Sequence, residues 1–351
     1  MSFHFSRKFW KRMTTALFII AGLLVLAATV GVWLGAEFMV RPKRRTLEPR
    51  HRELLARPSE FGMKLEQFTI TTSDGFALKA FLANPIPETQ MGEAARTRRM
   101  LDRLDDAGVA ESDTIRGTVY FLHGRGGVKE NMLTIAQRFV AANYRCVVYD
   151  ARAHGESEGT FSTFGFLETG DLARVMDHTE DLLRMRGEKP RQRIGFGISL
   201  GAATLLQALE KESSIDLGIA VAPFADLREQ IRRTGQRASS WKIPSHIPDI
   251  VTKLGGSRAN FDPFSIKPLR SAEQIRVPVF VAHGRLDGVI SIEDSRQIFA
   301  ALTHPNKQWR EVPEGYHGNV LAEGGDDLYQ EMVEFCLKHR KQDANVGAPS
   351  T

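Results

Sequence analysis

The fold of this chain is decided by residues 193–211, which read RIGFGISLGAATLLQALEK. The first five residues form a short apolar run typical of a buried strand, and Leu200 to Lys211 has helical spacing. A strand therefore passes into a helix through Gly197-Ile198-Ser199-Leu200-Gly201. Small residues two positions before and after Ser199 permit a tight turn that lifts the serine hydroxyl above the sheet. We interpret Ser199 as a nucleophile, and a serine that caps the helix is the alternative.

Strands and helices alternate along the rest of the chain. Apolar or alternating runs predict further strands at 64–71, 76–83, 117–122, 145–149, 217–221, 278–282 and 308–312. Helical spacing predicts helices at 132–142, 172–183, 292–302 and 328–339. The first two strands flank a Ser73-Asp74-Gly75 turn and read as a hairpin. The pattern predicts an α/β fold with a mostly parallel eight-stranded sheet, an antiparallel N-terminal hairpin and helices on both faces.

Two further residues fit the chemistry of a serine nucleophile. A serine hydroxyl needs a base, and the base needs a carboxylate that orients it. In sheets that carry this turn, the chain order is serine, acid, histidine. Asp287 follows the strand VFVAHG, and His317 lies in Gly315-Tyr316-His317-Gly318 after the last strand. We predict His317 as the base and Asp287 as the acid, with Asp226 as the rival acid and ordinary loop roles as the alternative for each.

A glycine-rich loop completes this set of residues. The strand GTVYFL runs into His123-Gly124-Arg125-Gly126-Gly127. Two backbone N–H groups can hold the oxyanion of a tetrahedral acyl intermediate, and we predict those of Arg125 and Leu200. We expect the Arg125 side chain to be solvated and His123 to shape the loop rather than act as a second base. A dinucleotide site is excluded, because the third glycine of that pattern is replaced by Lys129.

The N-terminal region predicts a membrane anchor. Residues 13–36 carry no charge in 24 positions, enough to span a bilayer core of roughly 30 Å. Basic residues flank both ends, and Trp10 and Trp33 fit interfacial positions. A cleaved signal peptide is the alternative, although its apolar region is usually about 7–15 residues. The basic residues on both sides leave the orientation open, and the two cysteines, Cys146 and Cys336, fit either compartment.

Composition excludes several classes of protein. The 351 residues are 42% hydrophobic and 25% charged, which is ordinary for a globular protein. The net charge of +5 is local: residues 1–57 hold 11 basic and 3 acidic residues, a net of +8, which leaves 5 − 8 = −3 for the rest. We therefore expect no nucleic-acid partner. Two cysteines make neither a disulfide framework nor a four-cysteine zinc site.

We divide the chain into a basic flank (1–12), a transmembrane anchor (13–40), a basic linker (41–63), a catalytic domain (64–340) and a disordered tail (341–351). Within the domain, 85–116 is charged and is expected to be a solvated surface insertion, although Met100, Leu101 and Leu104 fall on one face of a possible helix. Residues 223–262 are expected to form a lid over the site.

From about Lys64 to Arg340 the chain resembles the α/β-hydrolase superfamily, and within it the membrane-anchored hydrolases related to serine aminopeptidases and acyl-peptidases. The motifs that carry the resemblance are His123-Gly124, residues 150–157 (DARAHGES), the Ser199 pentapeptide with Ala202-Ala203, Asp262-Pro263, His283-Gly284 leading to Asp287, and Gly315-Tyr316-His317. Ala153 replaces a glycine that is usual in the family. The resemblance implies serine hydrolysis without a metal or an organic cofactor, and structural roles for Arg152 and His154.

We predict an esterase that forms an acyl-enzyme, with acyl-lipids and thioesters among the candidate small-molecule or lipid substrates. A peptidase or amidase with the same triad is the first alternative, and Glu156, Glu158 and Glu168 are its candidate residues for binding a peptide amine. A non-catalytic membrane scaffold is the second alternative. The sequence leaves acyl-chain length and oligomeric state open.

Overall fold

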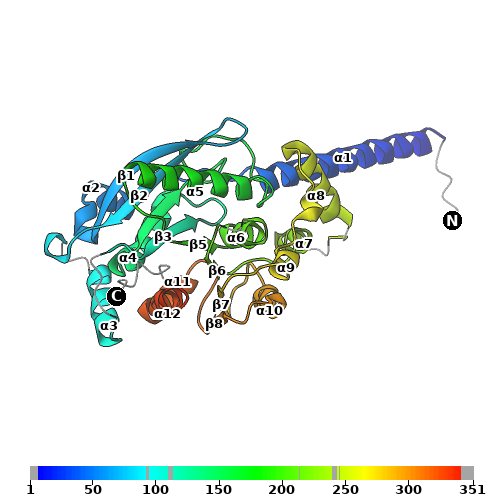
Figure 1. Ribbon diagram of the computed structural model, residues 1–351. Helices are drawn as coiled ribbons and strands as arrows, with labels where there is room; N and C mark the ends of the chain where they lie inside the picture. The colour runs from blue at the N-terminus through cyan, green and yellow to red at the C-terminus, as the bar shows by residue number, and fades with distance from the viewer. Residues whose placement is uncertain are drawn as a thin grey trace, which may run out of the picture.

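The computed structural model describes residues 7–91, 95–109, 114–212, 214–238, 243–244 and 246–340, and one eight-stranded sheet forms its centre (Figure 1). The spatial order of the strands is β1-β2-β4-β3-β5-β6-β7-β8. Their bounds are β1 Met63–Thr71, β2 Ala77–Pro85, β3 Gly117–Leu122, β4 Arg145–Tyr149, β5 Gln192–Ile198, β6 Leu217–Val221, β7 Val279–Gly284 and β8 Lys307–Val312. The pairs β1–β2 and β2–β4 are antiparallel and the other neighbours are parallel, which confirms the predicted mixed sheet with its N-terminal hairpin.

Helices cover both faces of this sheet. Their bounds are α1 Arg7–Val40, α2 Pro49–Ala56, α3 Ala95–Asp106, α4 Lys129–Ala141, α5 Glu168–Met185, α6 Leu200–Lys211, α7 Leu227–Ala238, α8 His246–Ala259, α9 Pro268–Ala272, α10 Ile292–Ala301, α11 Val320–Glu323 and α12 Gly325–Lys338, with short 3-10 turns at Pro58–Phe61, Glu88–Gln90 and Pro263–Ser265. One apolar cluster joins the sheet to α3, α4 and α12. A second joins the opposite face to α5, α6, α9 and α10.

The strand sequences explain this layering. Successive side chains of a strand point to opposite faces, and Val119 and Phe121 of β3 enter the first cluster while Tyr120 and Leu122 enter the second. Because both faces are buried, the strand reads as an unbroken apolar run rather than an alternating one. The parallel strands all end at the same edge of the sheet, which brings the loops after β3, β5, β7 and β8 together.

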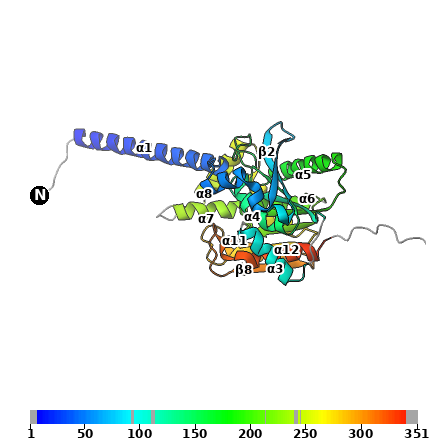
Figure 2. The ribbon, with the colours of Figure 1, turned by 90° about the vertical axis from the view of Figure 1, so that its left-hand side faces the viewer.

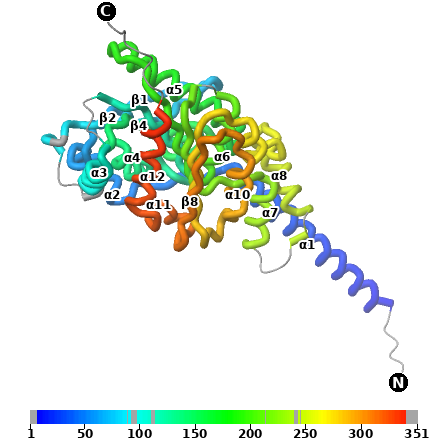
Figure 3. The backbone as a smooth tube through the Cα atoms, turned by 60° about the horizontal axis from the view of Figure 1, so that its bottom comes forward, coloured from blue at the N-terminus to red at the C-terminus, as the bar shows by residue number. Residues whose placement is uncertain are grey.

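The helix α1 projects from the body of the molecule (Figures 1 and 2). It runs without a break over 34 residues and is long and apolar enough to span a membrane. Its outer part is exposed, whereas Ala36, Met39 and Val40 near its inner end are buried. There α1 packs against α8, and α8 packs against α7 (Figure 3). The inner end of α1 therefore meets the body of the molecule at α8.

The segment 85–116 differs from our expectation. Its helix α3 is not a solvated insertion, because Met100 and Leu104 are buried against the α4–α12 face of the domain. Two arginines next to these residues pair with α12: Arg99 lies 2.7 Å from Asp326, and Arg103 lies 2.7 Å from Asp327. The apolar face of this charged helix decides its position.

The other predicted segments are described in part. The linker 41–63 contains α2, and the Arg44 guanidinium donates to backbone carbonyls of 154, 155, 157 and 159, so the segment is docked on the domain. The predicted lid 223–262 contains α7 and α8, and its residues 239–242 and 245 lie outside the described residues. The predicted disordered tail 341–351 also lies outside them.

Candidate active site

Ser199 occupies a strained turn between β5 and α6. Its backbone has φ 54° and ψ −114°, a conformation that residues other than glycine rarely adopt. Its N–H donates to the carbonyl of Val221 on the neighbouring strand at 2.8 Å. A Cβ at Gly197 would collide with the backbone of Gly201, and one at Gly201 would collide with the carbonyl of Leu122. The two flanking glycines therefore let the chain fold tightly enough to present the serine at the end of the sheet.

The structure brings Ser199 together with His317 and Asp287. The Ser199 Oγ lies 3.0 Å from His317 Nε2, and His317 Nδ1 lies 2.7 Å from Asp287 Oδ2. These residues come from three loops that follow β5, β8 and β7. The chain order is serine, acid, histidine, as the predicted pattern requires. This is the arrangement in which a histidine can accept a serine proton while a carboxylate holds its ring.

Asp287 is fixed by more than His317. Its Oδ1 accepts from the N–H groups of Val289 at 2.7 Å and Ile290 at 2.9 Å. Its Oδ2 lies 3.1 Å from Nε2 of the fully buried His283, whose Nδ1 lies 2.6 Å from Ser295 Oγ. Burial by itself would raise the pKa of Asp287, but hydrogen bonds from His283 and His317 outweigh it and hold that pKa well below its usual range. Asp287 therefore stays ionised beside His317.

His283 is a site residue that sequence reasoning missed. The sequence singled it out only within the His283-Gly284 motif, without a role. Its position four residues before the predicted acid, at the end of a buried strand, was the available signal.

The loop after β3 lies against Ser199. A Cβ placed on Gly124 would be 3.4 Å from the Ser199 Cβ, an ordinary contact distance, so this loop lies directly beside the serine. Within the described residues, the backbone N–H groups of Arg125 and Leu200 have no hydrogen-bond partner. Leu200 opens α6, where the helix dipole also favours negative charge. Both groups are thus free to bind an oxyanion.

The Arg125 side chain is not solvated as expected. It donates to the carbonyls of Phe38 and, at 3.4 Å, of Met39, and its guanidinium lies 4.7 Å from the centre of the Phe38 ring. The last carbonyls of a helix have no partner within the helix and carry partial negative charge, so they attract a cation. The sequence could not indicate this contact, because the partner carbonyls lie 86 and 87 positions away.

Comparison with known proteins agrees with this architecture. Residues 113–268 match the family model described as serine aminopeptidase, S33. The chain has the fold of the α/β-hydrolases. The family-model match covers less than half of its 351 residues.

The chain is similar to several known proteins and solved structures. It is 31% identical over 204 residues to the uncharacterized protein YqkD of Bacillus subtilis, a match that covers 56% of this chain and 63% of that relative. Its structure aligns with a Pyrococcus furiosus esterase at a TM-score of 0.61 and 19% identity, over 85% of this chain and 99% of that one. An acylaminoacyl peptidase of Pyrococcus horikoshii aligns at a TM-score of 0.57 and 14% identity, over 87% of this chain and 46% of that one. At these structural identities the likeness establishes the fold.

Asp226, the rival acid, and His123, the possible second base, contact other groups. Asp226 Oδ1 accepts from the N–H of Glu229 at 3.2 Å, at the start of α7. Both ring nitrogens of His123 contact the backbone: Nδ1 lies 2.8 Å from the carbonyl of Gly124, and Nε2 accepts from the N–H of Ala151 at 3.0 Å. These contacts match the expected loop-shaping role of His123.

The motif 150–157 is tied together by buried ionic groups. Asp150 accepts from the Lys129 ammonium at 3.0 Å and from the Lys129 N–H at 2.7 Å. Arg152 bridges Asp171 and Asp74. Burial, together with the adjacent His123 ring, lowers the pKa of His154 to about 3. Arg152 and His154 therefore brace the loop. Neither residue lines the cavity that opens at Ser199.

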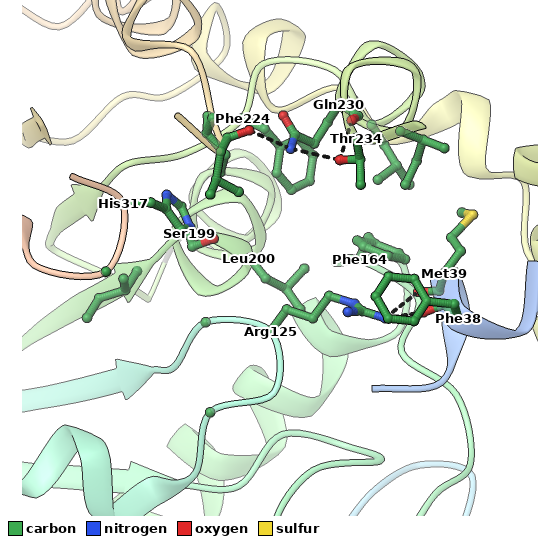
Figure 4. A pocket seen from close by; sticks show the side chains of 18 of the residues that line it. Phe38, Met39, Arg125, Phe164, Ser199, Leu200, Phe224, Gln230, Thr234 and His317 are labelled. Carbon is green, nitrogen blue, oxygen red and sulfur yellow. Dashed lines mark hydrogen bonds between the residues drawn. The ribbon is translucent and has the colours of Figure 1, made fainter. Parts of the chain in front are cut away.

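A cavity of about 750 Å³ opens from Ser199 and His317 (Figure 4). Its volume lies within the range of roughly 300–1,000 Å³ that is usual for small-molecule sites. Its wall is mostly apolar and includes Phe164, Leu200, Phe224, Leu227, Ile247 and Val251. Elements far apart in sequence meet here: α1, the loop after β3, and the predicted lid helices α7 and α8.

Proposed function

We propose that this protein is a membrane-anchored serine hydrolase that cleaves carboxylic esters. The observation that carries the proposal is the hydrogen-bonded chain from Ser199 through His317 to Asp287, beside two free backbone N–H groups. The apolar cavity that opens on this chain supplies a binding site for an acyl group. The exposed apolar stretch of α1 supplies the anchor.

The reaction follows from the geometry. Ser199 Oγ attacks the ester carbonyl while His317 accepts its proton, and the N–H groups of Arg125 and Leu200 bind the oxyanion. His317 then gives the proton to the leaving alcohol, and the acyl group remains on Ser199. A water activated by His317 releases the carboxylic acid and restores the serine. Asp287 stays ionised and stabilises the protonated histidine in both halves.

The peptidase alternative rests on the family match, and the structure lends it less support. A peptidase of this kind needs a carboxylate for the peptide amine, and the three candidate glutamates are engaged elsewhere. Glu156 contacts Lys129, Glu158 accepts from the Ala77 N–H, and Glu168 accepts from Thr163 and its neighbours. Among the described residues, the acidic side chain that lines the cavity is Glu48, and it pairs with Arg50 at 2.9 Å.

The test is labelling of the full chain in detergent with a fluorophosphonate, together with turnover of p-nitrophenyl esters. Ser199→Ala should abolish labelling and lower kcat by about 10⁶-fold, because it removes the nucleophile. The matched change Ser59→Ala, at an exposed serine, should leave both intact. A folded wild-type protein that is not labelled would contradict the proposal and favour the scaffold, and faster turnover of an aminoacyl arylamide than of the ester would favour the peptidase.

A further inference from the structure

The inner end of the anchor helix forms part of the cavity wall. Gly35, Phe38 and Met39 of α1 line the cavity that opens at Ser199. Figure 4 shows Phe38 and Met39 on the side of the cavity away from Ser199 and His317, with Phe164 beside them. Met39 belongs to one buried apolar cluster with Phe164 and Leu200. The helix that we propose as the anchor therefore also shapes the substrate site.

This wall is held in place by the catalytic domain. Glu37 forms ion pairs with Arg41, at 2.6 Å, and with Arg258 of α8. Arg125 binds the last carbonyls of α1. A Cβ on Gly35 would lie 3.4 Å from both methyl groups of Val251, which shows how closely α1 and α8 approach. The end of α1 is thus part of the domain rather than a flexible tether.

The apolar surface continues from the cavity to the outside at the same junction. Ile247 and Val251 of α8 line the cavity, while Ile250 of the same helix is 48% exposed. On α1, Phe38 lines the cavity and is 66% exposed, and Leu34 one turn earlier is 54% exposed. An acyl chain at this junction would contact apolar groups both inside and outside the domain, which favours entry of an amphiphile.

We propose that the end of α1 is the acyl-chain wall of the site, and that the substrate is a long-chain acyl ester that enters from the bilayer beside the packed junction of α1 and α8, over the exposed apolar side chains of Leu34, Phe38 and Ile250. The proposal rests on the proposed ester hydrolysis and adds the class of acyl group and its route. It assigns chain-length selection to Phe38, a residue of the anchor itself.

The first experiment measures kcat/KM of the full chain in lipid nanodiscs for glycerol esters from acetyl to palmitoyl. Each buried methylene should raise kcat/KM about fourfold until the cavity is filled. Phe38→Trp should move the preferred acyl group to a shorter one and Phe38→Ala to a longer one. Phe18→Ala, the same change at an exposed position far along α1, should leave the preference unchanged. Phe38 also contacts Arg125, so its substitution can change kcat for every ester alike. We therefore compare the ratios of kcat/KM between acyl-chain lengths, in which such a common change cancels. A preference that is the same in all four proteins would overturn the proposal.

The second experiment maps the acyl chain directly. A long alkyl fluorophosphonate with a diazirine at the end of its chain forms a bond between Ser199 Oγ and phosphorus as fluoride leaves, and light then cross-links the chain end. Peptide mapping should find adducts on 35–39 or 247–251. Adducts elsewhere, with Ser199 labelled, would overturn this inference and leave the proposed hydrolysis standing. Failure to label Ser199 in the folded protein would instead overturn the proposed function.

Discussion

Asp287 and Asp226, the predicted acid and its rival, lie in different environments in the folded chain. Asp287 lies 2.7 Å from His317 Nδ1, whereas Asp226 caps the start of α7. Asp287→Asn keeps the shape but removes the charge and the acceptor that set the histidine tautomer, so kcat should fall by about 10⁴-fold. Asp226→Asn should change kcat by less than about threefold, within the scatter expected of a surface cap. Ester turnover of both variants checks this, and the reverse ranking would make Asp226 the acid.

His154 gives the fold a dependence on pH. Burial lowers its folded pKa to about 3, while the unfolded value is about 6.5. Between these values the unfolded chain binds a proton that the folded chain does not. The contribution of neutral, buried His154 to the free energy of unfolding is therefore complete above about pH 6.5. It is lost at about 1.4 kcal/mol per pH unit as the pH falls toward 3.

His154→Gln should remove this dependence. As the pH is lowered from 6.5 to 5, the free energy of unfolding should therefore drop by about 2 kcal/mol less in this variant than in the wild type. Urea titrations at both pH values measure the difference. His246→Gln, at an exposed histidine, is the control and should keep the wild-type slope. Equal slopes in all three proteins would contradict the assignment.

At the scale of elements, α3 illustrates what the sequence could not predict. Its charged composition suggested a solvated insertion, yet Met100 is fully buried. Met100→Ala leaves a cavity and should lower the free energy of unfolding by about 2–5 kcal/mol, measured by denaturant titration in detergent. Asp105→Ala, on the exposed side of α3, should change it by less than about 0.5 kcal/mol. A small effect of Met100→Ala would mean that α3 is loosely docked and dispensable for stability.

The strands and most helices were predictable because their signals are local. The run GTVYFL is apolar on both faces wherever it occurs, and the turn around Ser199 needs its glycines within five residues. The remaining features depend on partners distant in sequence. The burial of α3 needs the surface of α4 and α12. The Arg125 contact needs the end of α1, and the cavity needs α1 beside α7 and α8. In the triad the residues were predictable from chain order, but the support of Asp287 by His283 required the folded loop.

At the scale of the whole molecule, the proposed anchoring by α1 makes predictions about where the protein resides. Under the proposed anchoring, the full chain should remain in the membrane pellet after carbonate extraction, with an unprocessed N-terminus by mass spectrometry. Leu24→Arg places a charge in the middle of the apolar stretch, at a cost of roughly 2.5–3.5 kcal/mol, and should reduce the membrane-bound fraction. Leu24→Ile is the control. An N-terminus found within or just after the apolar stretch 13–36 would show instead that the segment is a cleaved signal.

The docking of α1 on the domain has a geometric consequence. A catalytic domain on a flexible tether can turn and sample either its own membrane or a facing one. Here the ion pair between Glu37 and Arg258 and the Arg125 contacts fix the domain to the last turn of the helix. Under the proposed anchoring, a domain held in this way keeps one face toward one leaflet, so its encounters with the proposed lipid substrate become two-dimensional and confined to the bilayer in which it resides.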